Sequence, residues 1–370
     1  MMPTEYQICT NCVMDTTDIE ITFDENGVCN HCSDYQERKS KFLTDPTDLA
    51  KRLKNIIKKI KEAGKGKKYD CIVGVSGGVD SSYVAYLAKE WKLRVLLVHL
   101  DNGWDSELAV KNVENIVKKT GFDLYTLVIN WEEFKDLQRS FFKADVLDLE
   151  LLSDHAIFAT VYKLTRKFGI KYLLSGNNFE TEAIMPPSWN WRKSDAINIK
   201  AIHKQYGTIK LKTFPFMSTI LKTMYQYGGV AQSIPVLDYL DYNKGVVMKI
   251  LKNELDWKYY GGKHYESIFT RFYQGYILPK KFNIDKRRAH YSTLINSDQM
   301  NRKEAIDALK NEIYPVELQN QDFELVCKKL EYSRTELEDY INRLPKSHLD
   351  FKSDEKVYRL LKKIYSSVKS

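Results

Sequence analysis

The sequence predicts an α/β protein with a doubly wound parallel sheet, an N-terminal module of four cysteines and a helical C-terminal region. Apolar runs alternate with helical patterns after residue 69, which is typical of parallel strands joined by right-handed helical crossovers. A loop rich in glycine and serine follows the first apolar run, and two Cys-x-x-Cys pairs precede it. Because ligands of such sheets bind beyond the carboxyl ends of the strands, we expect a site there.

The alternation of patterns sets the order of the elements. Continuous apolar runs predict four strands, and apolar positions spaced by three and four residues predict helices. The strands are expected at residues 71–75, 94–100, 124–129 and 171–175, and the helices at residues 81–90, 107–119 and 154–168. Gly121 follows one helix as a C-cap. Residues 186–240 are expected to be irregular with some helix, and residues 301–370 to be helical.

Length and composition exclude several classes of protein. The chain has 370 residues, of which 43% are hydrophobic and 29% charged, close to ordinary globular values. This length suits two or three domains and excludes a single small module. No apolar run approaches the roughly 18 residues of a membrane span, so we expect no membrane partner. The N-terminus lacks the features of a secretory signal, so we expect a cytoplasmic protein.

The charge is mildly basic and concentrated early in the chain. A net charge of +8 suits an anionic ligand as well as a nucleic acid. Residues 49–62 predict a helix with one apolar stripe, and residues 51–68 hold nine Lys or Arg against one Glu. This segment is either a surface for RNA or a partner, or a docked helix with a solvated basic face. We favour the docked helix because the segment has no aromatic residues for base stacking.

Four of the six cysteines predict a metal site. Cys9 and Cys12 form one pair, Cys29 and Cys32 the other, and the 16-residue spacer can fold as a hairpin that joins them. Four soft ligands in a tetrahedral array suit Zn²⁺, whereas disulfides are disfavoured in a reducing cytoplasm. Four protein ligands leave no position for water, so we interpret the Zn²⁺ as structural.

The loop after the first strand is the strongest catalytic signal. Glycines allow a tight turn, and successive N–H groups at a helix N-terminus form a nest for anions. The nest consists of Ser76, Gly77, Gly78, Val79, Asp80, Ser81 and Ser82. Asp80 can cap the helix, bind Mg²⁺, or both. The loop lacks the lysine of a Walker A motif, and the simpler alternative is an ordinary glycine turn.

These residues resemble a known signature. The segment Ser76-Gly77-Gly78-Val79-Asp80-Ser81 resembles the SGGxDS motif of the ATP pyrophosphatase, or PP-loop, superfamily. The resemblance implies that ATP is cleaved to AMP and pyrophosphate while a substrate oxygen is adenylated. Two strand-end segments, HLDNG at 99–103 and SGNNFETE at 175–182, resemble the superfamily's adenosine and phosphate segments. They add Asp101, Asn102, Gly176, Asn177 and Glu180 to the expected nucleotide site. Each segment alone could also be an ordinary strand-end turn.

More specifically, the chain resembles the N-acetyl sugar amidotransferases of bacterial surface polysaccharide biosynthesis over nearly its whole length. The resemblance rests on CTNCVMDTTD, CNHC, SGGVDSSY, SDHAIFATVYKLTRKFGI, SGNNFETEA and WKYYGGKHYESIFTRFYQGYILPKKFNIDKRRAHYSTLI. It implies that ATP and Mg²⁺ activate an acetamido oxygen and that ammonia then forms an acetamidino group. The acceptor would be a nucleotide-linked N-acetylated sugar or a nonulosonic acid. The chain has no glutaminase signature, so a separate glutaminase is implied.

Catalytic roles follow from the same resemblance. Asp80 and Ser81 of the loop are expected to act on the phosphates. Lys281 and Arg287, in PKKFNIDKRR, could neutralise phosphate charge, although a solvated basic run is equally consistent. His155 could bind the sugar or deprotonate ammonia, while the neighbouring Asp154 can simply cap its helix.

The sequence also predicts domain boundaries and allows one rival function. We divide the chain into a zinc-ribbon module (1–40), a basic helix and linker (41–68), a PP-loop domain (69–300) and a helical C-terminal region (301–370). The rival is a PP-loop tRNA sulfur transferase, which usually needs cysteines near the nucleotide. Only Cys71 and Cys327 are spare, and both are expected in the core, so we expect no nucleic-acid partner. The oligomeric state, a homo-oligomer included, stays open.

Overall fold

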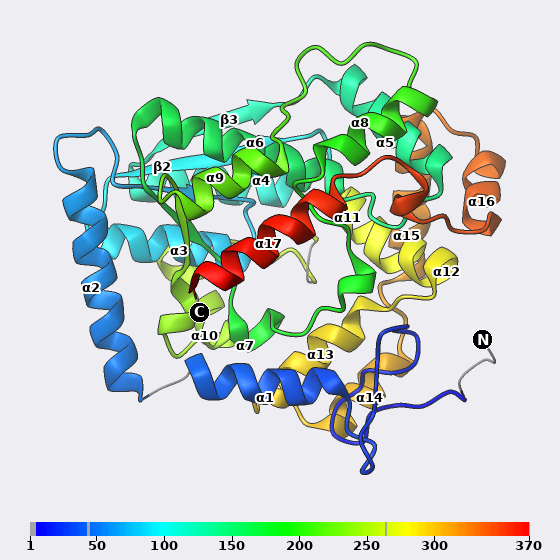
Figure 1. The fold of residues 1–370 in the computed structure, drawn as a ribbon, viewed down its shortest axis with the longest axis horizontal. Helices are drawn as coiled ribbons and strands as arrows, with labels where there is room; N and C mark the ends of the chain where they lie inside the picture. The colour runs from blue at the N-terminus through cyan, green and yellow to red at the C-terminus, as the bar shows by residue number, and fades with distance from the viewer. Residues whose placement is uncertain (1–4, 43–44, 263–264, 370) are drawn as a thin grey trace.

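A five-stranded parallel sheet forms the centre of the protein (Figure 1). The computed structural model describes residues 5–42, 45–262 and 265–369. The strands are β1 (Cys71–Gly74), β2 (Val95–Asp101), β3 (Asp123–Val128), β4 (Tyr172–Ser175) and β5 (Gln232–Pro235). Their order in the sheet is β3-β2-β1-β4-β5, and every neighbouring pair is parallel. The order reverses between β1 and β4, the position where ligands bind in open sheets of this kind.

Seventeen α-helices are described in the same residues. They are α1 (Asn30–Phe42), α2 (Pro46–Gly64), α3 (Val79–Glu90), α4 (Glu107–Thr120), α5 (Trp131–Ala144), α6 (Leu151–Phe168), α7 (Phe179–Glu182), α8 (Ala196–Tyr206), α9 (Thr219–Tyr227), α10 (Lys244–Leu255), α11 (Ile268–Phe272), α12 (Leu278–Phe282), α13 (Lys286–Asn296), α14 (Arg302–Lys310), α15 (Val316–Leu330), α16 (Arg334–Asn342) and α17 (Glu355–Lys369). A π-helical turn, Tyr273–Ile277, joins α11 to α12.

Helices cover both faces of the sheet because successive strand residues point to opposite sides. Cys71 and Val73 of β1 pack with α3, α4 and α10 on one face, whereas Ile72 packs with α6 on the other. Helix α2 adds its apolar stripe to the first face, where Ile60 is fully buried. The sheet is therefore doubly wound, as predicted, and the docked interpretation of the basic helix agrees with this packing.

A third hydrophobic cluster lies beyond the sheet. It joins the four N-terminal cysteines to α5, α8, α11 and α13, and to Leu330 and Tyr340 near the C-terminus. In Figure 1 the N-terminal module and α1 lie along α13 and α14. The helices expected after residue 301 are present, and α15 and α16 contribute buried side chains to this cluster. The four-part division of the chain stays a prediction, because the cluster crosses its boundaries.

The predicted strands and helices are all present, with ends that differ by up to three residues. Gly121 caps α4 in the left-handed conformation, with φ of 71°. Several elements were not predicted, among them α5, which follows β3, α10 to α13, of which α10, α11 and α13 supply part of the cavity wall, and β5, which lies inside the segment expected to be irregular. Strand β5 has only four residues, QSIP, and this short polar run carries no strand pattern. Among the described residues, no helix has the length and apolarity that crossing a membrane requires.

A buried carboxylate joins α2 to the two central strands. Asp70 accepts hydrogen bonds from the Arg94 backbone N–H at 2.7 Å and from its guanidinium at 2.6 Å. The same guanidinium donates to the carbonyl of Gly64, the last residue of α2, and to that of Lys67 in the link that follows. Asp70 is only 4% exposed to solvent, so these donors, and not water, compensate the negative charge of its carboxylate.

We expect Asp70→Asn to lower the free energy of unfolding by about 1–3 kcal/mol, because a buried charged hydrogen-bond network is broken. Urea unfolding followed by circular dichroism measures the change. Glu37→Gln removes an exposed carboxylate that pairs with Lys41 and should leave the unfolding midpoint unchanged. Equal effects of the two substitutions would contradict the role given to Asp70.

Candidate functional site

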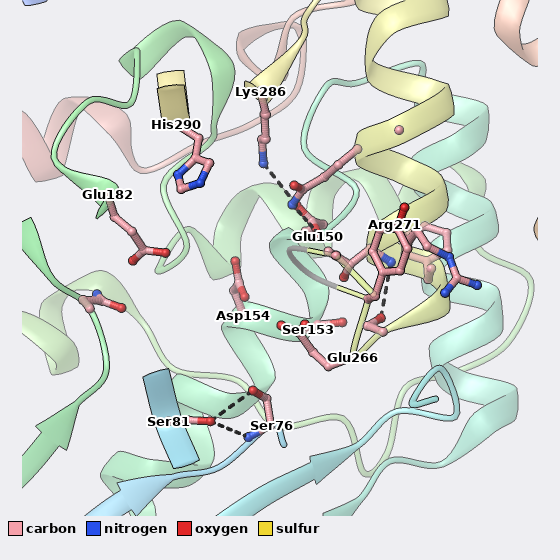
Figure 2. Close-up of a pocket in the computed structure, with 18 of the residues that line it drawn as sticks. Ser76, Ser81, Glu150, Ser153, Asp154, Glu182, Glu266, Arg271, Lys286 and His290 are labelled. Atoms are coloured by element: carbon pink, nitrogen blue, oxygen red, sulfur yellow. Dashed lines mark hydrogen bonds and ion pairs between the residues drawn. The ribbon is translucent and has the colours of Figure 1, made fainter. Parts of the chain in front are cut away.

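A cavity of about 1010 Å³ lies at the carboxyl edge of the sheet. Its wall includes Ser76 after β1, Asn102 after β2 and Asn177 after β4. These three strand ends were predicted to meet, and the structure brings them together. The opposite wall comes from the first turn of α6 and from residues 259–291, which carry Lys286 and His290 (Figure 2).

The glycine loop is held tightly between β1 and α3. Gly77 has φ of +80°, and a Cβ there would lie 2.4 Å from the Ala109 carbonyl oxygen of α4. The Gly77 carbonyl accepts from Trp257 Nε1 at 2.9 Å and from Asn112 Nδ2 at 3.2 Å. Gly78 is the N-cap of α3, so the loop turns directly into a helix N-terminus. This geometry suits an anion-binding nest whose backbone is fixed before the ligand arrives.

The loop side chains divide into two groups. Ser76 and Ser81 line the cavity, with 3.3 Å between their hydroxyl oxygens (Figure 2). Ser82 is buried and donates to the Gly78 carbonyl at 2.6 Å, so it braces the turn. Val79 is buried in the hydrophobic cluster beside the sheet. Asp80 accepts a hydrogen bond from the Tyr242 hydroxyl and does not line the cavity.

Of the residues predicted in the two strand-end segments, some line the cavity and others do not. Asn102 lines the cavity and donates to the Ser153 hydroxyl at 2.9 Å. Asp101 is outside the lining and accepts from the Gly103 N–H at 3.0 Å. Gly176 lies against α3, where a Cβ would be 3.1 Å from the Ser81 nitrogen. Its role is therefore close backbone packing.

In the segment 175–182, the acidic residue that lines the cavity is Glu182 and not the predicted Glu180. Asn177 lines the cavity, but Glu180 does not, and Gln299 donates to its carboxylate at 3.4 Å. Glu182, two residues further on, lines the cavity instead. The short helix α7 explains the difference, because positions two apart on a helix point in different directions.

His155 is not a catalytic candidate in this structure, contrary to our expectation. Its side chain is buried, with Nδ1 2.8 Å from the Lys193 carbonyl, and Nε2 accepts from the Met217 N–H at 3.2 Å. Burial lowers the pKa of His155 to about 4, so the ring is neutral at pH 7. Both ring nitrogens are used, and His155 lies outside the cavity lining. It is a satisfied core histidine.

Lys281 does not face the cavity, so it is not in a position to neutralise phosphate charge as we expected. Its ammonium group is buried and donates to Asp145 at 3.1 Å and to the carbonyls of Tyr340 and Arg343 at 2.6 and 2.7 Å. Burial lowers the pKa of Lys281, and the group ties α12 to α16 away from the cavity. Arg287 does line the cavity, but Asp285 binds its guanidinium at 2.7 Å. Its charge is therefore already paired.

Sequence reasoning missed most of the charged wall. Lys286 pairs with Glu150 at 3.3 Å, and Lys193 pairs with Asp154 at 3.0 Å (Figure 2 shows all but Lys193). Arg271 pairs with Asp322 through two contacts of 2.7 Å and lies over the Tyr265 ring. No motif marks Glu150 or Lys193, because they meet only after α6 and residues 190–195 fold together.

The four N-terminal cysteines converge as predicted. Their sulfur atoms lie within 4.8 Å of one another and all four residues are buried. The spacer is held by isolated bridges, Ile8 to Asp15 and Phe23 to Cys29, and Cys32 lies in the first turn of α1.

N–H groups point at the sulfurs. Asn11 and Asn296 donate to Cys32 Sγ at 3.3 and 3.4 Å, and the backbone N–H of Cys29 donates to Cys9 Sγ at 3.2 Å. Donors around sulfur stabilise thiolates, so this cluster fits a tetrahedral thiophilic ion such as Zn²⁺. Because Asn296 belongs to α13, the cluster also connects the N-terminal module to a helix that lines the cavity.

We expect Cys12→Ser to remove about one equivalent of bound zinc per chain, because serine is a poor ligand for a thiophilic ion. Elemental analysis of the purified protein measures the zinc, and thermal unfolding measures the loss of stability. Cys71→Ser changes a cysteine outside the cluster and should keep the metal. Equal zinc content in the wild type and Cys12→Ser would contradict the assignment.

Gly77→Ala should destabilise the fold more than Gly66→Ala. Both glycines have positive φ, so both substitutions carry the left-handed backbone cost of about 1–2 kcal/mol. Only at Gly77 does the new Cβ meet backbone, since nothing lies within 4 Å at Gly66. Urea unfolding of the two variants separates the clash from the dihedral cost. Equal destabilisation would show that the approach to Ala109 is not tight.

Two family models match separate parts of the chain. The C-terminal domain of WbpG-like LPS biosynthesis proteins matches residues 266–365, and NAD synthase matches residues 49–150. The second match covers β1, the glycine loop and β2, and the first covers α11 to α16 and most of α17.

Curated relatives match shorter segments. An uncharacterized protein of Methanocaldococcus jannaschii is 28% identical over 171 residues, 46% of this chain and 58% of that protein. The tRNA-specific 2-thiouridylase MnmA of Clostridioides difficile is 29% identical over 30% of this chain and 35% of its own. The tRNA(Ile)-lysidine synthase of Chlamydia pneumoniae is 38% identical over 20% of this chain and 23% of its own. The chain thus spans less than two thirds of each of these relatives.

Similar solved structures include two synthetases. NMN synthetase from Francisella tularensis is 11% identical, with a TM-score of 0.30, and the match covers 62% of this chain and 93% of that one. The NH3-dependent NAD synthetase of Campylobacter jejuni is 14% identical, with a TM-score of 0.30 and coverage of 58% and 94%. The sheet, the glycine loop and the match to NAD synthase support a PP-loop superfamily fold, and residues 266–365 match the WbpG-like LPS biosynthesis domain.

Proposed function

We propose that the protein is an ATP-dependent, AMP-forming amidotransferase that converts the acetamido group of a sugar into an acetamidino group. The observation that carries the proposal is the cavity itself. One wall is the glycine loop at the point where the strand order reverses, and the other comes largely from the WbpG-like segment. We therefore propose that ATP and a polar acceptor bind in the same cavity.

The loop supports a nucleotide that loses pyrophosphate. Its backbone N–H groups and the Ser76 and Ser81 hydroxyls offer donors, and no loop lysine is present to reach a γ-phosphate. An oxygen ligand suited to Mg²⁺ lines the same cavity in Glu182. Asp80, held by Tyr242 at the base of α3, would orient the loop beneath the phosphates.

Adenylation would make the amide group of the acceptor reactive toward ammonia. An amide carbon is a poor electrophile, and an AMP ester on its oxygen turns that oxygen into a good leaving group. Ammonia can then attack the carbon and displace AMP. We propose that a separate glutaminase supplies the ammonia and that the acceptor is a nucleotide-linked N-acetyl sugar or a nonulosonic acid of surface glycan biosynthesis. The four-cysteine cluster would hold structural Zn²⁺, because its four ligands leave no open position.

A tRNA sulfur transferase is the second candidate, favoured by the partial match to a tRNA-specific 2-thiouridylase. Sulfur transfer usually needs a reactive cysteine near the nucleotide. Cys71 is fully buried in β1, where burial raises the pKa of its thiol, and burial likewise raises the pKa of Cys327 to about 11. Neither thiol has the exposure or thiolate character of a sulfur carrier, so we favour the amidotransferase.

Turnover assays decide between the two. The purified protein is incubated with ATP, Mg²⁺ and ammonium, with UDP-linked N-acetylhexosamines and uronates, with free N-acetylated nonulosonic acids, or with bulk tRNA. We expect AMP and pyrophosphate only with an N-acetyl sugar, whose mass falls by about one unit as O is replaced by NH. AMP formation that depends on tRNA would favour sulfur transfer, and ADP as the product would overturn the proposal.

The loop serines offer a matched test of the nucleotide site. The double substitution Ser76→Ala and Ser81→Ala should lower acceptor-dependent AMP formation at least about tenfold, because two charge-assisted donors are lost. Ser40→Ala changes an exposed serine of α1 and should leave the rate unchanged. Full activity of the double variant would remove the loop hydroxyls from the mechanism.

A further inference from the structure

The first turn of α6 brings polar groups into the middle of the cavity. Glu150, Ser153 and Asp154 all line it, and Asn102 donates to the Ser153 hydroxyl. In Figure 2, Asp154 lies between the Ser76–Ser81 pair on one side and the Lys286–Glu150 pair on the other. Asp154 therefore extends from the wall opposite the glycine loop into the space between these two pairs.

Asp154 is the more open of the two carboxylates on this turn. Its side chain is 44% exposed to the cavity, whereas that of Glu150 is 14% exposed. Both oxygens of Glu150 accept from Gln274, at 3.0 and 3.2 Å, and Lys286 pairs with it as well. Among the described residues, Asp154 has one ion-pair partner, Lys193, at 3.0 Å.

Other carboxylates of the cavity have local partners of their own. Asp105 lies 3.2 Å from His99, Asp285 binds Arg287, and Tyr260 interacts with Glu266. Asp154 is thus a lining carboxylate whose contacts among the described residues, a single ion pair, leave room for a small ligand.

Lys193 fixes Asp154 in place. The Lys193 ammonium contacts Asp148 at 2.6 Å as well as Asp154, and Asp148 is buried and also accepts from the Trp191 N–H. Burial opposes the charge on Lys193, but the two carboxylates outweigh burial and raise its pKa. This lysine therefore stays charged, and it holds the Asp154 carboxylate toward the cavity.

We infer that Asp154 is the base that accepts the proton of the incoming ammonium, and that Lys193 is its positioning residue. The inference deepens the proposed amidotransferase function and rests on it. It assigns to Asp154 the second half of the reaction only, after the acceptor has been adenylated.

In the proposed amination, Asp154 takes the first proton and AMP is the leaving group. Ammonium gives one proton to the Asp154 carboxylate, and the nitrogen lone pair then forms a C–N bond to the adenylated amide carbon. The C–O bond to AMP breaks, and its electron pair leaves with the phosphate oxygen. A proton lost from the new nitrogen ends on solvent, and Asp154 returns its own proton to solvent before the next turnover. No oxidant or reductant is needed.

The surroundings of Asp154 suit this role. Desolvation raises the pKa of Asp154, Glu150 and Asp148 raise it further, and Lys193 opposes them. Lys286, from α13, faces the same space through its pair with Glu150. A carboxylate with a raised pKa is a stronger base at neutral pH, as general base catalysis requires. Acidification through that pKa protonates the group, so amination should fail on the acid side before adenylation does.

The test separates the two half-reactions in the full-length protein. Acceptor-dependent exchange of labelled pyrophosphate into ATP reports adenylation without ammonia, and mass spectrometry of the acceptor reports amination. The acceptor is the N-acetyl sugar from the panel above that supports AMP formation. Asp154→Asn should keep the exchange rate within about threefold and lower amination about 100-fold, the size of a lost general base.

A pH series and matched variants sharpen the test. The deficit of Asp154→Asn should shrink as pH rises, because free ammonia then arrives without the extra proton. Asp154→Glu should recover part of the amination rate, and Lys193→Gln should shift the acid limb of the wild-type profile. Asp123→Asn, an exposed aspartate at the start of β3, should match the wild type.

Each remaining outcome counts against the inference. Equal loss of exchange and amination in Asp154→Asn would show a structural role, and full amination would show that another group takes the proton. If the wild type forms no AMP with any acceptor, the proposed function itself fails, and this role for Asp154 fails with it.

Discussion

Close backbone packing around the glycine loop is the constraint on which the site depends. The Gly77 turn is pressed against Ala109 of α4, and the loop after β4 reaches the N-terminus of α3 at Gly176. Side chains at either position would separate these segments. Trp257 and Asn112 then hold the Gly77 carbonyl, so the N–H groups of the turn are fixed in orientation. A site for anions thus exists before any ligand binds, which limits the cost of ordering it.

The second wall of the cavity depends on a different kind of interaction. Charged side chains from the start of α6, residues 190–195 and α13 pair with one another along this wall, and each pair is partly removed from water. Such pairs add little to stability, but they fix the positions of groups that face a polar ligand. The buried Lys281, which joins Asp145 to the end of α16, holds the C-terminal helices behind this wall.

The N-terminal cysteine cluster is hydrogen-bonded to α13, which forms part of this second wall. Asn296 donates to Cys32 Sγ, and Arg302 donates to the carbonyls of Cys9 and Cys12. Arg288 of α13 pairs with the buried Asp15. The N-terminal cysteine module therefore braces the helix that supplies Lys286 and His290 to the cavity. A change in this cluster would therefore disturb the wall that carries Lys286 rather than the glycine loop, which lies on the sheet.

Patterns that depend on neighbours in sequence determined a large part of this protein. Apolar runs, glycine caps, the Ser-Gly-Gly turn and the two Cys-x-x-Cys pairs act locally, so the parallel sheet, the strand-end loops and the cysteine cluster could be predicted from them. The tertiary structure alone decided which polar side chains face the cavity. His155 and Asp154 are adjacent in the chain, yet one is buried with both nitrogens bonded and the other opens into the cavity. Lys281 and Lys286 come from one basic run, yet Lys281 is buried beside Asp145 and Lys286 faces the cavity. The physical reason is that burial and charge pairing depend on contacts between residues far apart in the chain.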